Sequence, residues 1–301
     1  MATLQSSLDA AVLASRALGG GAPAAYIPEL RGVDPQTVGL AVTLADGTTC
    51  VAGDGPRFTL QSAAKLIVLC GLLEERGLDA VLDVVDVEPS GTGFASIAAL
   101  ETKGPRPANP LVNAGAIALC GQLGGNLEDR LGWLEDWCVR LFGERLPVNA
   151  RVLASERRTG DRNRAIAYLL QSAGVLTDAT ATLEIYFSLC SLEADVGIAS
   201  RLPALLAARG RRNGVTVLTP DTAARVVAIM ATCGMYNESG RFLVQTGMPA
   251  KSGVSGVIVA VANGRAGVAV HSPPVNPRGS SVRGLYLLER LSHEHGWHFA
   301  G

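Results

Sequence analysis

Residues 256–271 read GVIVAVANGRAGVAVH and contain two apolar runs joined by a tight turn. The first run, 256–262, is rich in β-branched residues, and the Asn263-Gly264 pair that follows it is the strongest short hairpin signal in a sequence. The second run covers residues 266–271. Because a short turn cannot hold the long crossover that parallel strands need, this stretch predicts an antiparallel hairpin.

A second hairpin is predicted near the N-terminus. Residues 38–44 alternate in polarity, Asp46-Gly47 supplies the turn, and residues 48–52 return. With one hairpin near each end of the chain, we expect an α/β fold of the α+β kind. Its antiparallel sheet would take strands from both ends and be flanked by helices.

The middle of the chain is predicted to be helical. Apolar residues recur at helical spacing in six segments between the hairpins. These segments are residues 62–76, 110–123, 131–142, 165–173, 178–192 and 219–232. The last segment begins Thr219-Pro220-Asp221, a cap with proline in the first turn. Two further helices are expected at residues 1–14 and 281–293.

This order of elements predicts a single interwoven unit, although 301 residues amount to about two typical domain lengths. We expect an α/β lobe formed by residues 1–61 and 237–301, and a helical lobe formed by residues 62–236. A cleft between the two lobes is the default place for a ligand.

Composition and charge narrow the class of partner. The chain is 48% hydrophobic and 18% charged, with a formal net charge of −1, so it lacks the basic footprint expected of a protein that binds nucleic acid or an anionic membrane. The N-terminal segment, residues 1–14, has no Lys or Arg and so lacks the basic region of a secretory signal. Six cysteines occur without a Cys-x-x-Cys pair, which favours buried free thiols and a cytoplasmic protein.

Ser62-Ala63-Ala64-Lys65 is the sharpest local pattern with catalytic potential. If Ser62 opens a helix, Ser62 and Lys65 lie on one face, and burial of the lysine in the apolar run that follows would lower its pKa toward that of a usable base. A helix N-terminus also suits an acyl oxyanion, because backbone N–H groups point outward there. The same tetrad is typical of a capping serine beside a lysine whose amine reaches water, so both readings stay open at this point.

Lys251-Ser252-Gly253 directly precedes the second hairpin, where a strand would line the cleft. Taken alone, this tripeptide is equally consistent with an ordinary loop that carries a solvated lysine. Together with Ser62-x-x-Lys65, it resembles the arrangement of serine β-lactamases and penicillin-binding proteins. Those enzymes also carry a Ser-Asp-Asn tripeptide that is absent here, which argues against a β-lactam enzyme.

Longer fragments resemble the serine-dependent glutaminase family. They occur in the order of that family, over a region that runs from about Tyr26 to Gly284. The fragments are Tyr26–Leu30, Glu88–Phe94, Asn109–Ile117, Gly160–Ala165, Cys233–Asn237 and Met248–Val254. This resemblance implies a β-lactamase-like sheet with an inserted helical cluster, and hydrolysis of L-glutamine to L-glutamate and ammonia.

The resemblance also implies roles for individual residues. Ser62 would be the nucleophile and Lys65 its base. Tyr236 would move protons between the nucleophile and the leaving ammonia. Val254 would give its backbone N–H to an oxyanion hole together with that of Ser62. Besides Ser62, Tyr236 and Val254, the implied substrate-binding residues are Tyr26, Gln61, Asn113, Glu156, Asn163 and Tyr186.

Each substrate-binding residue has a structural alternative. Asn113 could satisfy the first turn of a helix, Asn163 could be a capping residue, and Glu156 could pair with Arg157 or Arg158 on the surface. The three tyrosines, at positions 26, 186 and 236, could be core aromatics whose hydroxyls are satisfied.

No cofactor and no metal is expected. His293, His295 and His298 form a His-x-His-x-x-His run that we interpret as a solvated tail. The expected partner is L-glutamine, with no nucleic acid and no membrane, and the expected assembly is a homo-oligomer, either a dimer or a tetramer. Two other readings stay open: the same machinery acting on another amide, an ester or a β-lactam, and a catalytically silent glutamine-binding protein.

Overall fold

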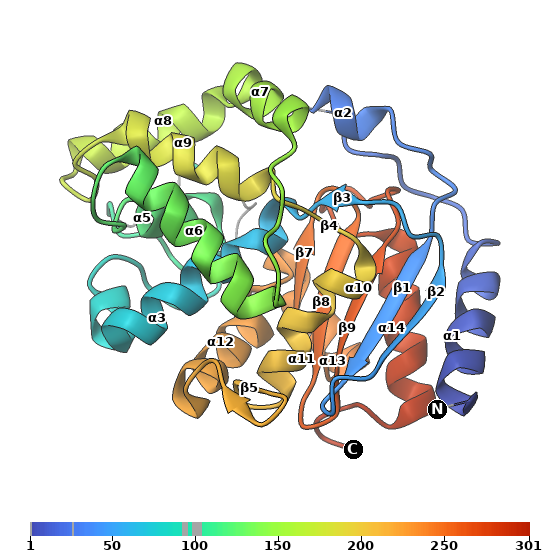
Figure 1. Cartoon of the computed structure of the whole chain (residues 1–301). Helices are drawn as coiled ribbons and strands as arrows, with labels where there is room; N and C mark the ends of the chain where they lie inside the picture. The colour runs from blue at the N-terminus through green and yellow to red at the C-terminus, as the bar shows by residue number, and fades with distance from the viewer. Residues whose placement is uncertain (1, 26, 92–95, 98–103) are drawn as a thin grey trace.

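A five-stranded antiparallel sheet takes its strands from both ends of the chain (Figure 1). The computed structural model describes residues 2–25, 27–91, 96–97 and 104–301. The strands follow the order β2-β1-β9-β8-β7. Their bounds are β1 Gly39–Leu44, β2 Thr49–Gly53, β7 Ala250–Gly253, β8 Val257–Ala262 and β9 Ala266–His271. Both predicted hairpins are confirmed, and β1 joins them by pairing with β9.

Both faces of the sheet are buried, which explains why β8 and β9 read as nearly continuous apolar runs. Successive side chains of a strand point to opposite faces. Accordingly Val257, Val259 and Val261 belong to the larger hydrophobic core, whereas Ile258 and Ala260 belong to a second core.

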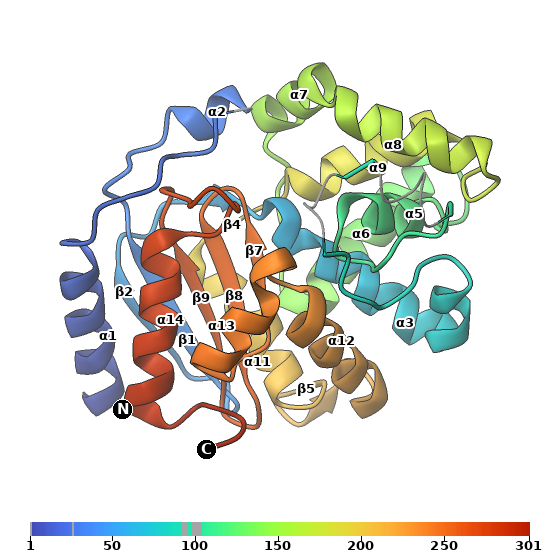
Figure 2. The ribbon, with the colours of Figure 1, turned by 180° about the vertical axis from the view of Figure 1, so that it is seen from behind.

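Helices cover these two faces (Figures 1 and 2). One face carries the N- and C-terminal helices, both of them predicted: α1 Ala2–Ser15 and α14 Val282–His295. Beside α14 lies α13 Ser239–Thr246. The other face carries α10 Val196–Ala199 and α11 Arg201–Ala207.

The helical middle of the chain is confirmed at all six predicted segments. The helices are α3 Lys65–Leu82, which follows the 3-10 turn η1 Gln61–Ala64, then α5 Asn113–Cys120, α6 Leu127–Phe142, α8 Asp161–Ser172, α9 Ala179–Cys190 and α12 Pro220–Cys233. Local caps define three of these starts, one of them at α9, where the Asp178 carboxylate accepts from the Ala181 N–H. Asn126 forms a capping box with Asp129, and the Thr219 hydroxyl accepts from the Thr222 N–H as the Thr-Pro start predicts.

Other elements were not expected from the periodicity. The helix α7 Ala150–Thr159 is mostly polar, and its buried residues are Val152, Ser155 and Glu156. The helices α10 and α11 are short and apolar on nearly every side, so they lack an amphipathic stripe. The remaining elements are α2 Pro28–Arg31, β3 Phe58–Thr59, β4 Glu193–Ala194, β5 Arg211–Arg212, β6 Val215–Thr216 and η2 Tyr236–Glu238.

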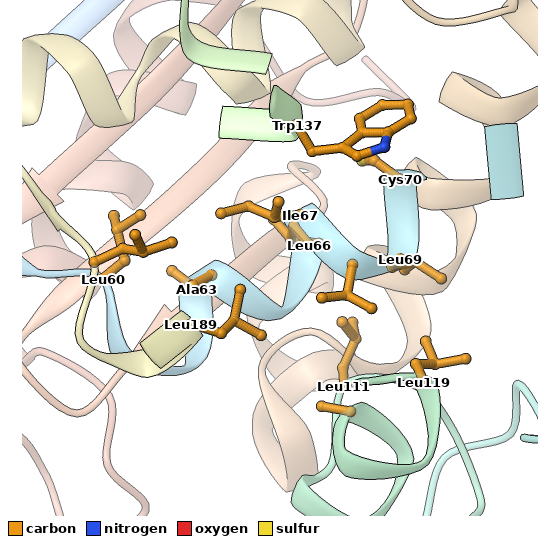
Figure 3. Packing of buried hydrophobic residues seen from close by; sticks show 14 of the residues in the cluster. Leu60, Ala63, Leu66, Ile67, Leu69, Cys70, Leu111, Leu119, Trp137 and Leu189 are labelled. Carbon is orange, nitrogen blue, oxygen red and sulfur yellow. The ribbon is translucent and has the colours of Figure 1, made fainter. Parts of the chain in front are cut away.

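The start of α3 is embedded in the larger core. Leu66, Ile67 and Leu69 have no exposed surface. The side chains packed around them come from the segment before α5 and from α5, α6 and α9 (Figure 3), and include Leu111, Leu119, Trp137 and Leu189. The edge strand β7 lies against η1 so closely that a Cβ on Gly253 would stand 2.6 Å from the Leu60 carbonyl oxygen. The segment before α3 is therefore held between the sheet edge and the helices.

The six cysteines are free and buried, as predicted. Within the described ranges, no helix combines the length and apolar character needed to cross a bilayer.

The contact between β9 and α11 yields a stability test. A Cβ at Gly267 would overlap the backbone of Pro203 and Ala204, and backbone cannot move aside as a flexible side chain can. We expect Gly267→Ala to lower the free energy of unfolding by about 2 kcal/mol or more, measured by urea denaturation. The matched control is Gly132→Ala in α6, where an added Cβ meets open space; it should be neutral or stabilising by up to about 1 kcal/mol. Equal effects of the two substitutions would contradict the close packing of α11 on the sheet.

Candidate active site

Ser62 is the second residue of the 3-10 turn η1, which runs directly into α3. Its side chain is almost completely buried. The preceding residue, Gln61, has a φ of +48°, a left-handed conformation that non-glycine residues rarely adopt. Ser62 therefore lies in the first turn of a helical segment and follows a residue with a strained backbone.

Lys65 lies one helical turn further along and is 1% exposed. Its Nζ donates to the Leu111 carbonyl oxygen at 3.2 Å and to Asn113 Oδ1 at 2.7 Å. Desolvation lowers the pKa of Lys65 to about 8. A neutral amine has two N–H bonds, and these two acceptors use both, so its lone pair stays available to take a proton.

Tyr236 begins η2 and brings a hydroxyl to Ser62 from a distant part of the sequence. A hydrogen bond links the two side chains, and burial raises the pKa of the phenol above its ordinary value. The Nζ atoms of Lys251 and Lys65 lie 4.0 and 5.7 Å from the centre of its ring. Its φ is +55°, so the site holds two residues in the left-handed region.

Asn113 and Asn163 extend the polar chain away from Lys65. Asn113 Nδ2 donates to Asn163 Oδ1 at 2.9 Å, while its Oδ1 accepts from Lys65. Asn113 is the first residue of α5, but its side chain makes no cap there, because Val112 holds the N-cap position without a side-chain bond. The Asn113 amide is thus turned toward the buried lysine, and the Asn163 amide holds Asn113 in place.

Glu156 lies on the buried face of α7 and is 5% exposed. Desolvation raises its pKa to about 7, against the opposing effect of a hydrogen bond from Gln61. The alternative of a surface ion pair is wrong for this residue. Arg157 instead pairs with Glu184 at 2.6 Å, and Arg158 donates to the Ser155 hydroxyl.

Tyr186 lies on α9 and is 2% exposed. Burial raises the pKa of its hydroxyl well above the ordinary value, and Cys190, Glu156 and Tyr236 are close enough to add to this effect. It also shares a hydrogen bond with Cys190. Tyr186 therefore belongs to the same buried polar group as Glu156 and Tyr236.

Val254 follows the edge strand β7 and packs on Ile27 and Leu30. Because Gly253 lies against η1, the backbone of Val254 is brought to the turn that carries Ser62. Among the described residues, no backbone carbonyl accepts a hydrogen bond from the N–H of Ser62 or of Val254. Two backbone N–H groups that are free to donate, next to a serine hydroxyl, can stabilise the oxyanion of a tetrahedral intermediate.

Of the predicted site residues, only Tyr26 lies outside the described residues, as do Thr92, Gly93 and Phe94 of one family fragment. All the others are brought together. Two further groups had no role assigned from the sequence. The first is Lys251, which is fully buried over the ring of Tyr236; burial and the charge of Lys65 hold its pKa well below the ordinary value. The second is Cys190, which shares a hydrogen bond with the Tyr186 hydroxyl. The motif Lys251-Ser252-Gly253 draws attention to Lys251 in the sequence, whereas no sequence motif points to Cys190.

The C-terminal histidines make separate contacts. His295 stacks on Trp297 with ring centres 4.9 Å apart, and His298 Nε2 lies 3.3 Å from the Val244 carbonyl oxygen. Over the described part of the chain, no group of three His, Cys, Asp or Glu side chains is arranged to hold a metal ion.

These groups together suit acyl transfer. A buried serine, an amine whose pKa lies near 8, a phenol on the serine and two unspent backbone donors are the parts that covalent hydrolysis of an amide or ester needs. The cluster also contains the Glu156 carboxyl, whose pKa lies near 7.

Comparison with known proteins points to one family. A family model described as Glutaminase matches residues 21–299. A glutaminase of Legionella pneumophila (strain Corby) is 50% identical over 285 residues, which cover 93% of this chain and 92% of the relative. A glutaminase of Clostridium tetani (strain Massachusetts / E88) is 38% identical, with 91% and 92% covered.

Solved structures that resemble this chain point to the same family. The probable glutaminase ybaS superposes with a TM-score of 0.95 at 38% identity, covering 99% of this chain and 98% of the other. The probable glutaminase of Bacillus subtilis superposes with a TM-score of 0.89 at 32% identity, covering 98% and 97%.

The raised pKa of Glu156 makes stability depend on pH in a defined direction. The folded chain keeps a proton on Glu156 that the unfolded chain releases between pH 4.5 and about 7. The contribution of this carboxyl is therefore complete below pH 4.5 and is lost as the pH rises through about 7. Relative to Glu156→Gln, the native sequence should lose about 3 kcal/mol of unfolding free energy over this range.

Urea denaturation at several pH values measures this difference. Glu135→Gln serves as the control, because it removes a carboxylate that lies at the surface as the partner of Arg145. Parallel stability curves for the native sequence and Glu156→Gln would show that Glu156 titrates normally.

Proposed function

Because this chain belongs to the glutaminase family, we propose that it hydrolyses the side-chain amide of L-glutamine to L-glutamate and ammonia. The observation that carries the proposal is the pair of Ser62 and Lys65. The serine is hydrogen-bonded to Tyr236, and the buried amine has both of its N–H bonds spent on acceptors.

Acylation begins when Ser62 Oγ attacks the amide carbon of glutamine and its proton passes to Lys65. The negative charge that develops on the amide oxygen is stabilised by the backbone N–H groups of Ser62 and Val254. Tyr236 passes a proton to the departing nitrogen and is reprotonated by Lys65. Ammonia leaves, Lys65 is again a neutral amine, and a γ-glutamyl ester remains on Ser62. An amide is a poor electrophile, and dividing hydrolysis into two steps lowers each barrier.

Deacylation uses the same groups in reverse. A water molecule gives a proton to the neutral amine of Lys65 as its oxygen attacks the ester carbon. The tetrahedral intermediate collapses, Ser62 takes back a proton, and L-glutamate is released. The net reaction consumes one water and forms one ammonia.

Substrate recognition is proposed to rest on the two charged ends of glutamine. Ionised Glu156 pairs with the α-ammonium group, and Asn113, Asn163 and Tyr186 donate to the α-carboxylate and the amide. Gln61, which bonds Glu156, orients that carboxylate, and Tyr26 is carried over from the family resemblance alone. A site built from such partners rejects analogues that lack either end, since its own polar groups would be left unpaired.

The organisation of the molecule is also a proposal. The strands of the five-stranded sheet lie within residues 1–61 and 237–301, which supports the expected division into two lobes. The helices α10 and α11 lie within residues 62–236 but pack on the sheet, so this part of the chain belongs with the α/β lobe. The free, buried cysteines support a reducing, cytoplasmic location. A homo-oligomeric assembly, and a partner set without nucleic acid or membrane, stay predictions.

Removal of the nucleophile or the base tests the mechanism. Ser62→Ala and Lys65→Ala should each lower kcat/KM for L-glutamine by about 10⁴-fold or more, because neither acylation nor deacylation can proceed. A coupled assay of glutamate production measures the rate, and circular dichroism verifies folding. The same assay with asparagine, and absorbance with a chromogenic β-lactam, distinguish glutamine from other acyl substrates. Full activity of folded Ser62→Ala would rule out the acyl-enzyme.

The pH profile tests the assigned protonation states. Activity requires ionised Glu156, whose pKa is about 7, and neutral Lys65, whose pKa is about 8, so kcat/KM should rise with pH through both values. Below about pH 6.5 we expect a fall of about 100-fold per pH unit, as two protons must be lost. Glu156→Gln should raise KM, remove the lower ionisation and leave a fall of about tenfold per unit. A profile of Glu156→Gln that matches the native one would contradict the ammonium contact.

A further inference from the structure

A cavity of about 300 Å³ lies beside the hydrolytic site, where α2, α7, β3, β4 and the turn after β7 meet. None of Ser62, Lys65 and Tyr236 lines it. Two of its lining residues are neighbours of the site. Thr59 accepts a hydrogen bond from Gln61 at 3.3 Å, and Ser255 directly follows Val254.

Three buried polar atoms on lining residues have no hydrogen-bond partner among the described residues. They are Glu29 Oε2, Ser255 Oγ and His271 Nδ1. Ser255 and His271 are each 4% exposed. Unsatisfied buried polar atoms are rare in folded proteins because each one costs stability. Three of them on the lining residues of one cavity point to a ligand whose binding turns these side chains toward it, since the atoms have almost no accessible surface in the free protein.

The chemistry of these atoms is mostly that of acceptors. His271 Nε2 lies 3.1 Å from the Ser255 carbonyl oxygen. A carbonyl can only accept, so Nε2 carries the proton and Nδ1 is left with a lone pair. The ring is fixed by stacking on Phe58, with centroids 4.1 Å apart, and burial lowers its pKa to about 4, which keeps it neutral. A group that satisfies Nδ1 and the Glu29 oxygen together must donate more than one hydrogen bond.

The lining of the cavity carries a net negative charge, which suits a ligand that donates hydrogen bonds and is positively charged. Three carboxylates line the cavity, on Glu29, Asp34 and Glu193, against one guanidinium, on the exposed Arg57. A hydrogen bond from Ser155 lowers the pKa of Glu29, with smaller contributions from two arginines of α7, so this carboxyl is ionised at neutral pH. The rest of the wall is largely apolar and includes Leu30, Phe58 and Val152, which suits a hydrocarbon body.

We propose that this cavity binds a small organic cation that carries a primary ammonium group on an apolar body. The ammonium donates to Glu29, His271 and Ser255, and the hydrocarbon lies against Leu30 and Phe58. The occupant also touches Thr59 and Ser255, which adjoin Gln61 and Val254, so it can influence the proposed hydrolytic site without entering it. Only this last step rests on the proposed function.

Calorimetric titration of n-butylammonium into the full-length protein tests the site directly and needs no catalysis. We expect saturable binding with one site per chain and a dissociation constant on the order of 1 mM. Butyltrimethylammonium has the same charge but no N–H, and butyrate has the opposite charge, so neither should bind measurably. Equal binding of butyltrimethylammonium would overturn the hydrogen-bonding assignment, and absence of n-butylammonium binding would overturn the site.

Two variants localise the binding. Glu29→Gln removes the charge, and His271→Phe removes the acceptor while keeping the stack on Phe58. Each should weaken n-butylammonium binding at least about tenfold, because each removes a hydrogen bond to a charged group. Glu135→Gln, a matched change on an exposed carboxylate that does not line the cavity, should leave binding unchanged. Native affinity in both cavity variants would contradict the proposal. If His271→Phe fails to fold, the affinity of Glu29→Gln alone tests it.

Titration of Ser62→Ala with excess L-glutamine present separates the two sites. The amine should still bind, because the cavity is distinct from the position of the substrate. Complete displacement by glutamine would place the amine in the hydrolytic site and overturn the proposal. Saturable amine binding by a protein that shows no glutaminase activity would leave this second site in place while refuting the proposed reaction.

Discussion

Burial of the Lys65 amine at the start of α3 is the constraint on which the site depends. The surrounding turns are apolar and have almost no exposed surface, so an amine there is costly unless acceptors reach it. The Leu111 carbonyl and Asn113 are those acceptors, and Asn163 holds Asn113 in turn. Helices α5 and α8 must therefore dock against α3 in one arrangement for the lysine to be satisfied.

The same low-dielectric surroundings act in opposite directions on acids and bases. They lower the pKa of Lys65 to about 8 and raise the pKa of Glu156 to about 7, and in both cases the neutral form gains. The left-handed backbone at Gln61 and Tyr236 adds conformational strain at the same place. Such costs are tolerated only because the sheet edge at Gly253 and the helical core hold the segment on both sides.

The elements that could be predicted are those whose signals are local. The two hairpins carry their own turns, and the long helices carry apolar stripes and caps such as Thr219. The missed helices lack such signals: α7 is mostly polar, although it presents Glu156, and α10 and α11 are apolar without a polar face. Their helical state depends on packing against β9, β1 and α9, which no short window of sequence contains.

The sequence by itself placed Ser62 and Lys65 on one face of an expected helix, through their spacing of three residues, and the family resemblance made them the proposed nucleophile and base. It also determined the family, through fragments such as Asn109–Ile117 in a constant order. The tertiary structure alone decided what these residues can do. Tyr236 reaches Ser62, Gln61 reaches Glu156, and the amine of Lys65 is buried against Leu111 and Asn113 only in the folded chain. Burial and hydrogen bonding between segments far apart in the chain set the pKa values, and neither exists before the chain folds.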